Sequence, residues 1–206
     1  VNEVYTLDIP KEYDWSFLKA SSAISTVAEH KSGYASVTTQ GTAVTLQSSN
    51  TISAAHTGRK IKFSGNANIY DFTYSQATGG TILPPLSGIA NVSTGGYTIY
   101  QNIYSLPADF DRFPVNGGLL FYSAGQPKPL PELLDDDYYE QVTASPSSVP
   151  DNCRLVGYDT AGNRQFEVLP PPSQVYILLN EYIKILPPMS ENTMGTVVIT
   201  SNQTAV

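Results

Sequence analysis

The chain has 206 residues, only 14% of them charged, and a formal net charge of −7 at neutral pH. Its 15 Gly, 15 Pro and 14 Tyr favour many short strands and turns over helices. Its 11 Lys and Arg are too few for the basic face of a non-specific nucleic-acid binder, so direct binding of DNA is not expected. No apolar run is long enough to span a bilayer, and we expect no membrane contact.

The least strand-like part of the sequence is the N-terminal segment, residues 1–30. A short helix is predicted near its middle, with Phe17 and Leu18 facing inward. Trp15, the sole tryptophan, is interpreted as an anchor of a core or of an interface, because its ring buries a large apolar area. Residues 21–27 alternate weakly and fit either a strand or coil.

From Tyr34 onward the sequence alternates with a period of two, which indicates strands. In the first hairpin, Val37, Val44 and Leu46 share one face. The strands predicted in this region are 35–39, 42–46, 57–63, 69–74, 81–83 and 97–104. The turns between them are predicted at Gln40-Gly41, 64–68, Gly79-Gly80 and Gly95-Gly96. We expect a first unit over 31–104, a meander the size of a small barrel or sandwich.

Residues 104–112 are interpreted as the junction with a second β unit, because Pro107 has no N–H to donate to a ladder. We expect this second unit over 105–200, followed by a short tail at 201–206. The strands predicted in it are 117–122, 153–158, 164–169, 174–186 and 196–200. The second and third of these form the strongest hairpin in the chain.

One short helix is predicted over 131–141. Pro131 suits its first turn, acidic residues follow, and Leu134, Tyr138 and Val142 are spaced four apart on one face. The expected fold class is therefore mainly β, with antiparallel sandwich-like or barrel-like meanders and one short helix.

Residues that carry catalytic or metal chemistry in other proteins are scattered in this sequence. His30 and His56 lie far apart without spaced partner ligands, and Cys153 is the only cysteine, so neither zinc nor a disulfide is expected. The acidic run 135–137 is consecutive, whereas calcium loops space their ligands alternately, and it is interpreted as a solvated helix start. We expect no catalysis, no metal and no cofactor.

Aromatic residues supply the candidate binding surface. Tyr70, Phe72 and Tyr74 repeat at every second position, a stripe that suits stacking on sugars or bases but is more often sheet surface packed against a neighbour. The Pro-rich segments 123–131 and 144–152 are long enough to reach the sheet edge of a neighbour. The candidate subunit-interface residues are Trp15, Tyr70, Phe72, Tyr74, Tyr138, Tyr139, Pro127 and Pro129.

Several short motifs follow one another along the chain. They are Asp14-Trp15, Gly58-Arg59-Lys60-Ile61 with Tyr70, Tyr97–Tyr100, Tyr104–Phe110, Gly157-Tyr158-Asp159 with Gly162, Leu169–Pro172 and Leu186-Pro187. Their order resembles that of tailed-bacteriophage virion proteins at the head-to-tail junction, the adaptor, connector or neck proteins. The likeness covers most of residues 13–188. Such proteins usually carry helices outside the β region, and no long helix is predicted here.

The resemblance implies structural work in the virion, with assembly in the host cytoplasm and no reaction or cofactor. It implies a homo-oligomeric ring of about a dozen copies, in contact with the portal and other neck or tail proteins. DNA passes such a ring without specific contacts, which suits an acidic chain. The alternative is a β-sandwich binding module that recognises carbohydrate or a host receptor.

Overall fold

Strands make up nearly all the regular structure of the chain. The computed structural model describes residues 16–47, 52–87, 91–114, 118–123, 126–132 and 149–185. Its helical elements in these residues are two single 3-10 turns, η2 (Ser16–Leu18) and η3 (Ala54–His56). Every ladder between named strands is antiparallel, so the predicted fold class, mainly β and antiparallel, is confirmed.

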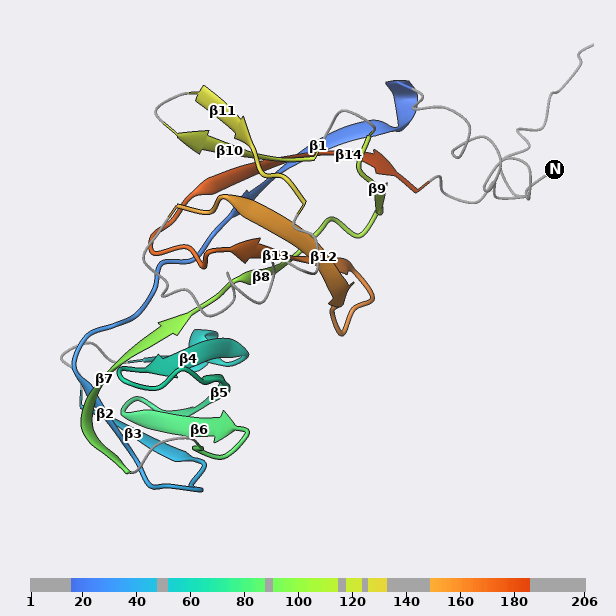
Figure 1. Ribbon diagram of the computed structural model, residues 1–206. Coiled ribbons are helices and arrows are strands. Elements are labelled where there is room, and N and C mark those ends of the chain that lie inside the picture. Colours follow the sequence, from blue (N-terminus) through green and yellow to red (C-terminus); the bar gives the residue numbers. More distant parts are fainter. Residues whose placement is uncertain are drawn as a thin grey trace, which may run out of the picture.

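Six strands close into a barrel, in the order β2-β3-β6-β5-β4-β7 (Figure 1). They are β2 (Tyr34–Val37), β3 (Ala43–Gln47), β4 (Arg59–Phe63), β5 (Ile69–Gln76), β6 (Gly79–Leu83) and β7 (Val92–Tyr100). The predicted hairpin of β2 and β3 is confirmed by the pairing of Ala35 with Leu46. Closure leaves the barrel without a free sheet edge.

The barrel interior is filled by the apolar half of each alternating strand. Val37, Val44, Leu46, Ile61 and Phe63 all point inward, as their spacing predicts, and each is at most 3% exposed. Together with Phe72 and Ile99, which are fully buried, they form one continuous core. At ~25 cal/mol per Å² of apolar area removed from water, such a core is the main source of the barrel's stability.

Gly79 and Gly80 correct one prediction, because they lie inside β6 and not in a turn. Both are buried, and a Cβ added at Gly80 would lie 2.2 Å from the Thr73 carbonyl oxygen and 2.6 Å from the Phe72 ring. Glycine is required here by close approach of a neighbouring strand and not by a reversal of the chain.

The second unit is a pair of facing sheets. One sheet has the order β1-β14-β10-β11, with β9 also paired to β14, and the other has the order β12-β13-β8. Their strands are β1 (Lys19–Ser25), β8 (Ile103–Ser105), β9 (Phe110–Arg112), β10 (Leu119–Ser123), β11 (Gln126–Pro129), β12 (Asn152–Tyr158), β13 (Arg164–Leu169) and β14 (Ile177–Lys184). Leu178 and Leu119 from one sheet and Phe166 and Val168 from the other share a core. The predicted hairpin of β12 and β13 is confirmed.

The first strand changes the predicted division of the chain. β1 was predicted as part of an N-terminal segment, yet it pairs along its whole length with β14, from Lys19 opposite Ile183 to Ser25 opposite Ile177. The barrel is therefore an insertion between β1 and β8, two strands of the second unit. The sequence of β1 alternates only weakly because its apolar residues Ala20 and Ile24 are only partly buried against the core of the second unit.

Predictions for the N-terminal segment, for the helix and for the C-terminal region have different outcomes. Leu18 is fully buried, but Phe17 is 56% exposed and does not face inward, because one 3-10 turn ahead of β1 directs only one of these neighbours to the core. The predicted helix over 131–141 begins with extended residues, since Glu132 forms a bridge with Cys153. The rest of that helix, the strand at 196–200 and the tail at 201–206 lie outside the described residues.

Candidate functional site

Two segments join the barrel to the second unit, and both are fixed by hydrogen bonds. In the first, the backbone of His30 donates to and accepts from Ile99 of β7, at 2.8 Å in each direction. In the second, Gln101 and Asn102 separate β7 from β8. The predicted continuous strand 97–104 is therefore wrong, because these two residues leave the barrel ladder and join the second unit.

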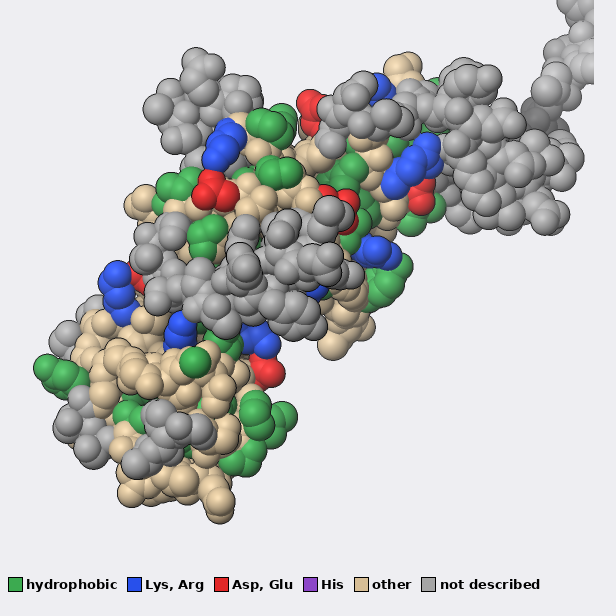
Figure 2. Space-filling model, viewed as in Figure 1, with side chains coloured by type: hydrophobic (Ala, Val, Ile, Leu, Met, Phe, Trp, Pro, Cys, Tyr) green, Lys and Arg blue, Asp and Glu red, His purple; other side chains and the backbone are tan. Residues whose placement is uncertain are grey.

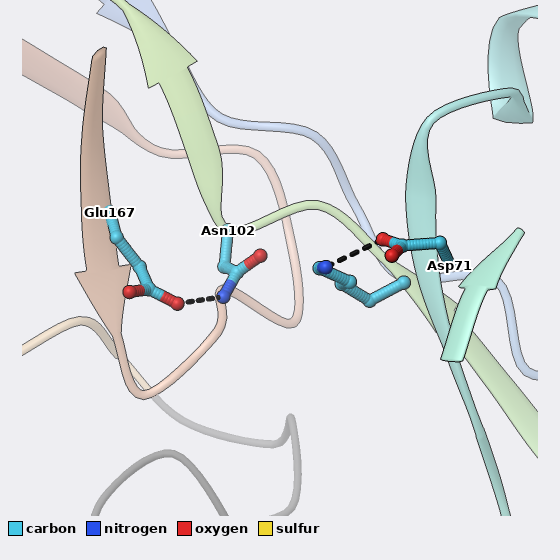
Figure 3. Close-up of polar contacts among 4 residues, drawn as sticks. Asp71, Asn102 and Glu167 are labelled. Atoms are coloured by element: carbon cyan, nitrogen blue, oxygen red, sulfur yellow. Dashed lines mark hydrogen bonds and ion pairs between the residues drawn. The ribbon is translucent and has the colours of Figure 1, made fainter. Parts of the chain in front are cut away.

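Asn102 binds the second unit through both its backbone and its side chain. Its carbonyl oxygen accepts a hydrogen bond from the Val168 amide at 2.8 Å. Its Nδ2 donates to Oε1 of Glu167 at 2.6 Å, and both side chains are buried (Figure 3). The guanidinium of Arg154 lies 3.5 Å from the other oxygen of Glu167. A buried carboxylate is costly without partners, so these contacts hold the junction in one geometry.

Tyr104 adds a further link at the junction. Its hydroxyl donates to the Gln101 carbonyl oxygen at 2.9 Å and accepts from the Val27 amide at 3.1 Å. Burial of the ring raises the pKa of this hydroxyl to about 12. It therefore stays protonated, as the hydrogen bond to Gln101 requires.

A cleft of about 330 Å³ opens where the two units meet. It is lined by Thr57, Gly58, Arg59, Lys60, Asp71, Gln101, Asn102, Ile103 and Gln165. Lys60 and Asp71, paired across β4 and β5, form an ion pair at the barrel side of the cleft (Figure 3). The lining thus combines charged groups of the barrel with amide side chains of the linker and of β13.

Arg59 is the charged residue of the cleft that has no acidic partner among the residues that the structure describes. It begins β4 and is half-buried, and its Nε is fully buried without a hydrogen-bond partner. Desolvation lowers the pKa of its guanidinium from the usual value. It nevertheless remains a cation at neutral pH, because the guanidinium pKa starts above 12.

Two histidines lie close to Arg59. The rings of His30 and His56, which the sequence places far apart, are 5.4 Å from centre to centre and meet edge to face. The Tyr97 hydroxyl donates to the Ser32 carbonyl oxygen at 2.9 Å, so His30 Nε2, 3.1 Å away, is the donor to that hydroxyl. Burial, followed by the charge of Arg59, lowers the pKa of both imidazoles.

The structure separates the predicted interface residues. The prediction that Tyr70 and Phe72 lie at a subunit interface is wrong. Their side chains are 1% and 0% exposed, because both point into the barrel core. The Tyr70 hydroxyl reaches the barrel end, where it donates to the Ser87 carbonyl oxygen at 3.0 Å. Tyr74 is partly buried against the same core.

The other predicted interface residues lie in the second unit or outside the described residues. Pro127 and Pro129 are in β11, opposite β10, and Pro129 is exposed. Trp15, Tyr138 and Tyr139 lie outside the described residues, as do the acids 135–137. The segments 123–131 and 144–152, predicted to reach a neighbour, are described only in part, and β11 occupies most of the described portion of the first.

The remaining candidates are the Cys153 thiol and possible metal ligands among the described residues. Burial raises the pKa of the Cys153 thiol to about 12, and its Sγ donates to the Leu130 carbonyl oxygen at 3.3 Å. The thiol is therefore not a nucleophile at neutral pH. In the part of the chain that the structure describes, no three His, Cys, Asp or Glu side chains gather as a metal site. No described helix has the length and apolar character needed to cross a bilayer.

Sequence reasoning missed the residues that build the cleft. Arg59 and Lys60 were noted as members of a strand and of a motif in the resemblance but not as site residues, and Asn102 was placed inside a predicted strand. Glu167 alternates with Phe166 and Val168, which face the core, so the period of two placed its side chain on the opposite face and gave no sign of its buried partner Asn102. Comparison of the chain with protein-family models, curated proteins and solved structures gives no match.

Proposed function

We propose that this chain is a structural protein of a tailed-bacteriophage virion, working as one copy in a ring at the head-to-tail junction. In this role it binds portal, neck and tail proteins and performs no reaction. The proposal rests on the resemblance of the ordered motifs, and the surface of the barrel is the observation that supports it best.

The barrel surface is almost free of charge. From residue 34 to residue 100 the only charged side chains are Arg59, Lys60, Lys62 and Asp71, all on β4 and β5. The outward residues of β3, β5 and β6 are mainly Thr, Ser and Gln, and Leu83 is 65% exposed among them. Figure 2 shows the barrel face as mostly uncharged, with basic side chains gathered toward the second unit. Surfaces that pack against other chains are depleted of charge in this way.

The charge is distributed unevenly along the chain. The barrel carries three basic and one acidic residue, and all the remaining acids lie elsewhere in the sequence. Copies that each carry a net charge of −7 repel one another, so a contact through an uncharged surface is favoured. Head-to-tail contacts of this kind close into a ring when the rotation permits.

The motifs that carry the resemblance also contact one another in space. Asp159 of one motif accepts a hydrogen bond from the hydroxyl of Ser105 in another, at 2.7 Å. Arg59 of a third lies close enough to Tyr104 to affect the pKa of its hydroxyl. Motifs that are separate in sequence thus gather around the junction, which supports their reading as one structural unit.

The test is assembly of the full chain, measured by analytical ultracentrifugation and by co-purification with virion proteins. Wild-type protein should form closed oligomers or enter particles. Leu83→Glu, which puts a charge on the barrel, should weaken assembly without unfolding the chain. Thr160→Glu, at an exposed turn of the second unit, is the matched control and should assemble normally.

Two results would contradict the proposal. One is a wild-type chain that stays monomeric at its highest soluble concentration and is absent from purified particles. The other is a monomer that binds a defined sugar on a glycan array, which would favour the carbohydrate-binding alternative. Two residues of the aromatic stripe that suggested this alternative, Tyr70 and Phe72, are buried in the barrel core and cannot contact a sugar.

A further inference from the structure

Arg59 is a half-buried cation, and no partner for its guanidinium lies in the described part of the chain. No hydrogen bond or ion pair to its guanidinium occurs among the described residues, and its Nε is fully shielded from solvent. A buried donor without an acceptor destabilises a fold, the more so when it is charged. Arginine is favoured at sites that bind a carboxylate or a phosphate, because its guanidinium has a fixed charge and a planar fork of donors.

The acids nearest the cleft are already engaged. Asp71 is paired with Lys60, so these two charges cancel. Glu167 accepts from Asn102 and lies beside Arg154. Arg59 therefore leaves the lining of the cleft with one uncompensated positive charge.

The remaining lining suits a small oxyanion. Gln101 and Gln165 contribute neutral amide groups, and the cleft volume of about 330 Å³ accommodates a group of a few heavy atoms. One uncompensated positive charge balances one negative charge, whereas a divalent phosphate would leave one negative charge of its own uncompensated. A planar carboxylate also matches the fork of a guanidinium, with two parallel hydrogen bonds.

We propose that the junction cleft is a carboxylate-binding site, with Arg59 as its principal binding residue. The carboxylate belongs either to a small molecule or to an acidic side chain of another protein chain, because the recognition chemistry is the same. This inference is independent of the virion role, since a carboxylate site would serve a binding module equally well.

The experiment observes the Arg59 side chain directly by NMR. The full chain, labelled with ¹⁵N, is titrated with sodium acetate in a buffer free of carboxylate and phosphate, with sodium chloride as the ionic-strength control. The Arg59 Nε–H resonance is assigned by its loss in Arg59→Gln. Acetate should move this resonance, and the backbone amides of Gly58 and Asn102, in a saturable way that chloride does not reproduce.

Three variants make the result decisive. Arg59→Gln should abolish the acetate-dependent shifts of the neighbouring amides. Lys62→Gln removes the same charge from the same strand but does not line the cleft, and it should bind acetate as the wild type does. Where Arg59→Gln fails to fold, Arg59→Lys replaces it and should bind about tenfold more weakly, because a lysine cannot form the bidentate pair.

Dilution of the protein without acetate distinguishes the two sources of the carboxylate. If the group comes from another copy of the chain, dilution itself moves the Arg59 resonance and acetate competes. If it is a small molecule, the resonance is independent of protein concentration. The proposal is overturned if acetate and chloride act alike, or if the acetate-dependent shifts persist in Arg59→Gln.

Discussion

The barrel and the second unit are built from the same kinds of residue but are closed in different ways. The six strands of the barrel come from one stretch of the chain, and they close into a single sheet in which each strand pairs with two others. The second unit gathers strands from both sides of that stretch and keeps edge strands such as β1 and β11. The barrel is therefore formed within one stretch of the chain, whereas the second unit depends on pairing across that stretch, as between β1 and β14.

The two cores also differ in the polar groups that they contain. The polar atoms inside the barrel are at its end, where Asn66 donates to the Tyr70 hydroxyl at 2.8 Å. In the second unit, Asn180 is completely buried in β14, and neither of its amide atoms has a hydrogen-bond partner among the described residues. Ser22, directly opposite it on β1, has an unpaired buried hydroxyl as well. Among the described residues, the second unit thus has more buried polar side-chain atoms without a hydrogen bond than the barrel does.

The largest expected effect tests whether the two cores are independent. Phe72→Ala leaves a cavity in the barrel and Phe166→Ala leaves one in the second unit, because both rings are fully buried. Each should lower the free energy of unfolding by about 3–5 kcal/mol. Amide hydrogen exchange should accelerate mainly in β2–β7 for the first variant and mainly in β12–β14 for the second. Equal acceleration throughout the chain would mean that the two units unfold as one.

A smaller effect is expected at the junction between the units. Asn102→Ala leaves the buried Glu167 without its 2.6 Å hydrogen bond and should lower the free energy of unfolding by about 1–3 kcal/mol. Asp71→Asn breaks the ion pair with Lys60. Because the Asp71 side chain is well exposed, this change should lower the free energy of unfolding by less than about 1 kcal/mol. Urea unfolding measures both. A larger loss in Asp71→Asn than in Asn102→Ala would show that Glu167 does not depend on Asn102.

The smallest effect is a difference in acid sensitivity. The folded state lowers the pKa of His30 and His56 below the usual 6.5, so protons bind the unfolded chain more readily. The free energy of unfolding is therefore unaffected by these histidines above pH 6.5, and it falls as the pH drops below 6.5 and the unfolded chain takes up protons. Hydrogen bonds from Ser105 and Asn163 lower the pKa of Asp159 to about 2, so its contribution is lost only below its usual value of 3.8.

We therefore expect mild acid to destabilise the barrel side of the junction before the hairpin of the second unit. Urea unfolding between about pH 7.5 and about pH 5.5 measures the effect of the histidines. The double variant His30→Gln, His56→Gln should flatten that dependence, whereas Asp159→Asn should leave it unchanged. A double variant with the slope of the wild type would mean that other groups control the acid sensitivity.

The sequence predicted the fold where the pattern is local. The alternation that points Ile61 and Phe63 inward, and the hairpin of β12 and β13, follow from side-chain period and turn residues alone. The pairing of β1 with β14 has no such signal, because seven residues of weak alternation do not specify a partner far along the chain. Gly79-Gly80 was misinterpreted because glycine marks a close approach as often as a turn, and only the position of Phe72 decides between them.

The candidate site was less predictable than the fold. The cleft contains Arg59 from the barrel, Gln101 from the linker and Gln165 from the second unit, and none of them belongs to a spaced motif. Its charge balance depends on which acids are already paired, which is a property of the packed structure. The aromatic stripe misled for a related reason, because a stripe on one face of a strand is equally suited to a core and to a surface.

The insertion of the barrel between β1 and β8 has a consequence for synthesis on the ribosome. Thr26, just after β1, bonds to Tyr176, just before β14, and the two are 150 residues apart. At typical rates of translation, β1 leaves the ribosome on the order of ten seconds before its partner exists. The barrel is complete well within that interval. If the two cores are independent, as the hydrogen-exchange experiment tests, the barrel folds while β1 is still without its partner β14.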